Sequence, residues 1–130
     1  MQMCLELEVR CLFDINVSIL QNDGWMDPKL SIVSAKGILS ADPYDLSDLD
    51  LALNVIRGQV KMTDAYMVLL SYTMTLESDL YSPLSAIYVH GETEFERIGR
   101  YQEYMITGNQ VVLIGQPVNK LLDCEIAGFF

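Results

Sequence analysis

Residues 65–76, AYMVLLSYTMTL, run for twelve positions without a charged side chain. Aromatic and β-branched residues are frequent in this stretch, and such residues are enriched in β-strands. A strand with no charge on either side is typical of the middle of a sheet, where both faces are covered. We therefore expect residues 65–76 to form a central strand, and the other elements are assigned outward from it.

Two shorter strands are expected downstream. Residues 77–83 have the composition of a loop, and residues 84–89 form a short apolar run that ends at a His-Gly pair. Residues 110–114 are compact and rich in β-branched side chains. Pro117 is expected to end that strand, because proline cannot donate a hydrogen bond to the ladder. The last segment, 120–130, favours neither helix nor strand.

Between these strands, a helix is predicted over residues 94–106. Thr93 and Glu96 match a capping box, in which each side chain accepts a hydrogen bond from a backbone amide of the first turn. Four residues lie at the spacing of one helical face: Phe95, Ile98, Gln102 and Met105. This pattern favours an amphipathic helix.

Upstream of the central strand, a shorter helix is predicted over residues 48–57. Ser47 and Asp50 also match a capping box, and Gly58 suits the end of a helix. One helical face would carry Leu49, Ala52, Leu53 and Ile56. The competing interpretation is a strand, because apolar residues also alternate at Leu49, Leu51, Leu53 and Val55.

The beginning of the chain alternates between apolar and polar side chains. Apolar residues occupy the odd positions over 3–19, which predicts a strand with one buried face, assigned to residues 3–13. Asp23 and Gly24 provide a turn signal with positive φ, and residues 29–35 are expected to return as a strand.

These elements together predict a small α+β fold in which residues 1–130 form a single domain. The expected architecture is a mainly antiparallel sheet with two helices packed on one face. An all-β sandwich is the alternative, and it follows if both helix predictions are wrong.

Composition and charge exclude several classes of protein. The 130 residues include 18 acids and 8 bases, a net charge of −10, and 51% are hydrophobic, which is too many for a disordered chain. Direct binding to a nucleic-acid backbone requires clustered lysine and arginine, so we do not expect it. No apolar run is long enough for a membrane-spanning helix, and no signal peptide is apparent. Three cysteines are an odd count, which favours reduced thiols and a cytoplasmic location.

Sequence motifs for catalysis are lacking, and we predict no enzymatic activity, catalytic residue, metal site or cofactor. The chain has a single histidine, His90, and no nucleotide-binding, nucleophile-elbow or zinc-protease motif. A zinc site would need several more nitrogen or sulfur ligands than the scattered cysteines supply.

Three short fragments nevertheless resemble the class III nucleotidyl cyclase family. They are residues 12–15, 63–68 and 114–119, in the order of that family's metal-binding strand, acidic turn and Gly-x-x-Val-Asn segment. The resemblance implies a metal-dependent nucleotide site built on Asp14 and Asp64, with both carboxylates on neighbouring strands. The sequence departs from the family pattern at two positions, where a glycine and an acidic residue are expected: Thr63 and Gln116. A diverged domain of this kind is the alternative functional hypothesis.

The uneven distribution of charge supports the preferred hypothesis. Residues 37–56 contain four acids and no base, and six acids with no base lie between Lys61 and Arg97. We therefore predict an acidic protein-binding module, an inhibitor, immunity or adaptor protein, whose partner is a basic protein such as a nucleic-acid-binding protein or nuclease. The expected partner-binding residues are Trp25, Asp42, Tyr44, Asp45, Asp48, Asp50 and Tyr81. Assembly with copies of itself is a third hypothesis.

Overall fold

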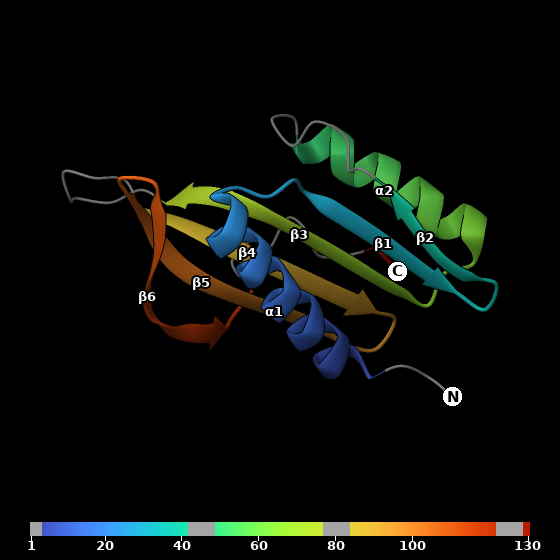
Figure 1. Cartoon of the computed structure of the whole chain (residues 1–130). Helices are drawn as coiled ribbons and strands as arrows, with labels where there is room; N and C mark the ends of the chain where they lie inside the picture. The colour runs from blue at the N-terminus through green and yellow to red at the C-terminus, as the bar shows by residue number, and fades with distance from the viewer. Residues whose placement is uncertain (1–3, 42–48, 77–83, 122–128) are drawn as a thin grey trace.

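The computed structural model describes residues 4–41, 49–76, 84–121 and 129–130, and they form a six-stranded sheet with two helices. In chain order the elements are α1 (Leu5–Asp23), β1 (Lys29–Ser34), β2 (Gly37–Ala41), α2 (Leu49–Thr63), β3 (Met67–Leu76), β4 (Leu84–Thr93), β5 (Arg97–Thr107) and β6 (Gln110–Asn119). The strand order is β2-β1-β3-β4-β5-β6, and every neighbouring pair is antiparallel (Figure 1). The predicted α+β class with an antiparallel sheet is therefore confirmed.

The central strand is the one that the uncharged stretch predicted. β3 pairs with β1 on one side and with β4 on the other, from Met67 opposite Thr93 to Leu76 opposite Leu84. Its side chains alternate between two core clusters, with Met67 and Leu69 in the first and Val68 and Leu70 in the second. Both faces of β3 are therefore covered by apolar side chains.

The expectation of a strand at residues 3–13 is wrong, because residues 5–13 belong to α1. The buried side chains of α1 recur every three or four positions: Leu5, Val9, Phe13, Asn16 and Leu20. Leu7 and Ile15, which a strand would bury on the same face, are 58% and 57% exposed. Residues four positions apart share one face of a helix, and because four is an even number they also share one face of a strand. Most of these residues therefore fitted the strand pattern as well as the helix pattern. Gly24 ends the helix with φ at 79° and donates its amide to the Leu20 carbonyl.

The predicted helix at residues 94–106 is also wrong. Residues 94–96 form a turn, and Arg97–Thr107 forms β5, paired with β4 along its length. Ile98, Gln102 and Tyr104 face α1 and become buried or half-buried there. Gly99 within this segment disfavours a helix by about 1 kcal/mol, and pairing with β4 satisfies the backbone that a helix would have satisfied internally.

The helix predicted at residues 48–57 is confirmed, although its end is not where the sequence indicated. α2 continues through Gly58 to Thr63. Residues 42–48, which include the expected cap Ser47, lie outside the described residues.

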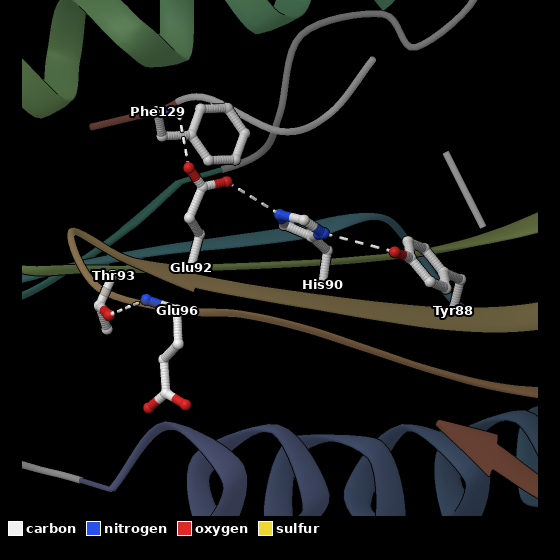
Figure 2. Close-up of polar contacts among 6 residues, drawn as sticks. All are labelled: Tyr88, His90, Glu92, Thr93, Glu96 and Phe129. Carbon is white, nitrogen blue, oxygen red and sulfur yellow. Dashed lines mark hydrogen bonds and ion pairs between the residues drawn. The ribbon is translucent and has the colours of Figure 1, made fainter. Parts of the chain in front are cut away.

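The two helices do not share one face of the sheet, as was expected. Buried residues of α1 belong to one core cluster, whereas Leu53, Ile56 and Val60 of α2 belong to the other. Figure 2 shows the same arrangement, with α2 above the strands and α1 below them. The reason is that the central strands carry buried apolar side chains on both faces, so each face packs against its own helix. Within the described residues, neither helix combines the length and apolarity needed to cross a lipid bilayer.

At the opposite edge of the sheet, β6 extends beyond its predicted end. Pro117 lies inside this strand, which continues to Asn119. An edge strand has one side without a partner strand, so a residue that lacks an amide hydrogen is tolerated there. Gly115, with φ at 68°, and a register shift opposite Tyr101 and Glu103 mark an irregular stretch near this proline.

At Gly91 of β4, the side chains of α1 pack directly against the sheet. A Cβ atom at this position would lie 2.4 Å from Val9 Cγ2 and 2.8 Å from Leu5 Cδ1. Only glycine therefore allows the first turns of α1 to rest directly on β4.

We expect the substitution Gly91→Ala to destabilise the fold by about 1–3 kcal/mol, because the added methyl group must displace α1. Gly58→Ala is the matched control, since an added Cβ at this position in α2 has no atom within 4 Å. The control should stabilise by up to about 1 kcal/mol, the helix preference of alanine over glycine. Urea unfolding of both variants measures the difference, and equal effects would contradict the close packing at Gly91.

Candidate functional site

A hollow of about 450 Å³ lies at the end of the sheet where α1 begins, α2 ends and β4 turns into β5. We call it the Phe95–Phe130 hollow. Its lining consists of Leu5, Ala35, Asp64, Ala65, Tyr66, Met67, Thr93, Glu94, Phe95, Glu96 and Phe130. Figure 1 shows the start of α1, the end of α2 and the β4–β5 turn at this one end. Five segments that are distant in sequence therefore supply one surface.

The β4–β5 turn presents two acids and an aromatic ring at the rim of the hollow. The Thr93 hydroxyl oxygen accepts hydrogen bonds from the amides of Phe95 and Glu96, both at 3.2 Å. The Thr93 amide donates to the Glu96 carbonyl at 2.9 Å. These bonds close the turn and leave the Phe95 side chain 88% exposed at its tip. The Thr93–Glu96 pattern that predicted a helix cap therefore stabilises a turn between strands.

The end of the chain is held to β4 by a row of buried polar groups, shown in Figure 2. Tyr88 Oη lies 3.3 Å from His90 Nδ1, and His90 Nε2 lies 3.1 Å from Glu92 Oε2. The other carboxylate oxygen, Glu92 Oε1, accepts a hydrogen bond from the Phe129 amide at 2.9 Å. Phe129 is buried between α2 and the sheet, whereas Phe130 is 42% exposed and reaches the hollow.

The hollow carries negative charge. Asp64, Glu94 and Glu96 line it, and among the described residues no lysine or arginine does. Arg97 and Lys61 line the adjoining surface on either side. Because α2 ends next to Asp64, its last carbonyl groups add partial negative charge, while Glu6 and Glu8 offset the positive end of α1. A cationic group is the ligand that this arrangement favours.

Trp25, one of the predicted partner-binding residues, lies far from the hollow. It follows the end of α1 and is 62% exposed. The hollow adjoins Leu5 at the start of that helix, and the span from Leu5 to Asp23 is about 27 Å at the helical rise. Asp50 lies in the first turn of α2, whereas the hollow lies at the end of α2. The other predicted residues lie outside the described residues: Asp42, Tyr44, Asp45, Asp48 and Tyr81.

The structure does not bring Asp14 and Asp64 together as a metal-binding pair. Asp14 is on the exposed side of α1, whereas Asp64 follows α2 on the other side of the sheet. The cyclase-like arrangement needs both on neighbouring strands, and neither is on a strand. In the ranges that the structure describes, no group of three or more acids, histidines or cysteines is placed to hold a metal ion. His90 is fully buried and occupied by the contacts to Tyr88 and Glu92.

Sequence reasoning did not identify the aromatic residues of the hollow. Phe95 was assigned to the apolar face of a helix, and Phe130 belonged to a segment of undetermined type. Six acids with no base between Lys61 and Arg97 were the available signal, since Asp64, Glu94 and Glu96 are among them. Asp64 is distant from Glu94 and Glu96 in the sequence, and it comes close to them only when the sheet has formed.

Comparison with models of protein families, with curated proteins and with solved structures finds no match for this chain.

The buried row on β4 leads to a test of how the chain end is held. We expect Glu92→Ala to cost about 1–3 kcal/mol for each buried group that loses its partner, namely the His90 ring and the Phe129 amide. Urea unfolding measures the loss, and hydrogen exchange at the Phe129 amide should become faster.

Glu94→Ala is the control, because it makes the same substitution on an exposed residue two positions further on. Its effect should remain within about 0.5 kcal/mol. A Glu92→Ala protein that unfolds like the control and still protects the Phe129 amide would contradict the role given to Glu92.

Proposed function

We propose that the protein is a non-enzymatic acidic binding module that engages a basic site on a macromolecular partner, as an inhibitor, immunity or adaptor protein does. The observation that supports this most is the Phe95–Phe130 hollow, in which three carboxylates and two exposed phenylalanines adjoin an open cavity. The net charge of −10 adds a long-range field of the same sign.

The chemistry of the hollow suits an arginine or lysine side chain. Such a side chain has an apolar stem, which packs on aromatic rings, and a cationic end group, which carboxylates and ring faces attract. Phe95 and Phe130 would contact the stem, and Asp64, Glu94 and Glu96 would surround the charge. Phenylalanine is also among the residues that are enriched in protein interfaces.

Electrostatic attraction would act mainly on the rate of association. Uncompensated carboxylates steer a basic partner towards the surface and raise the association rate constant by roughly 10–1000-fold at low salt. The second acidic region, formed by Asp42, Asp45, Asp48 and Asp50, remains part of this proposal, with Trp25, Tyr44 and Tyr81 as its aromatic contacts. Because Trp25 and the hollow lie at opposite ends of α1, a partner that touches both must be extended or large.

We also propose that the protein acts in the cytoplasm. Of the cysteines that the structure describes, Cys4 and Cys11 are both exposed and free, which suits a reducing compartment.

A test of the hollow uses an arginine-rich peptide, capped at both ends, as the probe. We expect amide NMR signals of residues 93–97 and Asp64 to shift during titration. The double variant Glu94→Gln/Glu96→Gln should weaken binding by roughly 2–30-fold, because each of the two exposed ion pairs contributes about 0.2–1 kcal/mol. Phe130→Ala should weaken it further.

The control for this titration removes the same charge elsewhere. Asp14→Asn/Asp23→Asn neutralises two exposed acids of α1, neither of which lines the hollow. If both double variants lose equal affinity, the peptide responds only to net charge, and the hollow is not the binding site.

A second test addresses the acidic region before and at the start of α2. Once the partner is isolated, association is measured for the wild type and for the variant Asp45→Asn/Asp48→Asn/Asp50→Asn. We expect the variant to associate roughly tenfold more slowly at about 0.01 M salt and to match the wild type near 1 M, where the Debye length falls from about 30 Å to about 3 Å. Equal association rates at low salt would show that these acids do not steer the partner.

A further inference from the structure

Residues 110–114 at the outer edge of β6 carry no charged side chain, proline or register shift, and the irregular stretch with Gly115 and Pro117 lies beyond them. β6 is the last strand of the sheet, and no other part of the chain that the structure describes pairs with its outer side. Proteins protect such edges with charged side chains, prolines, β-bulges, short strands or a covering element. β6 has ten residues and no charged side chain, and its Val112 and Val118 are 47% and 41% exposed.

The whole β5–β6 hairpin end is a neutral surface on an acidic protein. No charged residue occurs from Tyr104 to Asn119, although charged residues make up 20% of the chain. Two copies that each carry −10 repel one another wherever their acids meet. A neutral strip therefore suits a contact between copies, whereas a basic partner would prefer the acidic surfaces. The other edge strand, β2, has only five residues and lies between Lys36 and Asp42 in the sequence.

The ladder geometry defines which residues of β6 can pair outward. Gly108 and Asn109 form a two-residue loop, so Thr107 and Gln110 are the closing pair of the hairpin. Alternation along an antiparallel ladder then directs the backbone groups of 110, 112 and 114 towards β5 and those of Val111 and Leu113 outward. Gly115, with its positive φ, interrupts the regular strand after residue 114.

We propose that the protein forms a two-fold symmetric dimer through antiparallel pairing of β6 with β6 of a second copy, centred on Val112. In this register Val111 of one copy faces Leu113 of the other, and both pairs exchange backbone hydrogen bonds. The two Val112 side chains meet at the two-fold axis, where β-branched pairs stabilise a sheet. The same surface is used by both copies, as a closed dimer requires. The Phe95–Phe130 hollow is not part of this surface, so the inference is independent of the proposed function.

The test begins with the mass of the protein by light scattering and sedimentation over roughly 1–200 µM, where a dimer of the 14.7 kDa chain is expected. Val112→Lys places two like charges at the axis and should raise the dimer dissociation constant at least about tenfold. Val118→Lys is the matched control, since it adds the same charge to the same strand beyond Gly115, and it should leave the dimer intact.

A crosslinking variant tests the register directly. Val112→Cys brings two thiols together only if residue 112 faces its own copy, so mild oxidation should produce a disulfide-linked dimer whose 112–112 linkage is identified by mass spectrometry. Val118→Cys should not form the corresponding linkage. A monomeric wild type, a dimer that survives Val112→Lys, or the absence of a 112–112 linkage would each overturn the proposal.

Discussion

Burial of β3 and β4 on both faces is the constraint on which the rest of the structure depends. Both faces of this strand pair carry buried apolar side chains, and α1 packs against one face while α2 packs against the other. α1 approaches β4 so closely that only glycine fits at position 91. The edge strands of the sheet are β2 and β6, which lie farthest from the central pair β3 and β4.

Hydrogen bonds between buried polar groups hold particular elements in place. The Asn16 side chain of α1 donates to the Ser71 hydroxyl of β3 across 3.0 Å, and both residues are buried. On the other face, Glu92 accepts from the chain end at Phe129. Because a buried polar group without a partner is costly, each contact favours one position of its element over neighbouring ones. The second contact also brings Phe130 to the hollow.

The two proposed surfaces use different physical properties of one molecule. The hollow combines carboxylates with exposed phenylalanine rings, and such a surface suits cationic side chains. The edge of β6 is neutral and pairs with no other strand among the residues that the structure describes, and such a surface suits a strand of a second copy. Since the two surfaces do not share residues, a dimer would present two copies of the hollow to a partner, which raises apparent affinity when both can be engaged.

The sequence by itself predicted the central strand, because a long apolar run without a charge is typical of a strand that is covered on both faces. It also favoured the helix before that strand and the α+β class, although the alternation from Leu49 to Val55 left a strand and an all-β sandwich open. It also indicated that Thr93 bonds to the amide of residue 96, a contact that is local. Only the tertiary structure decided the form of residues 5–23 and 97–107. Residues four positions apart share one face in a helix and also in a strand, so the pattern over residues 5–23 did not decide between the two. Over residues 97–107, pairing with β4 outweighs a helical pattern in a segment that contains Gly99. The hollow belongs wholly to the tertiary structure, since its carboxylates and rings come from segments that meet only when the sheet forms.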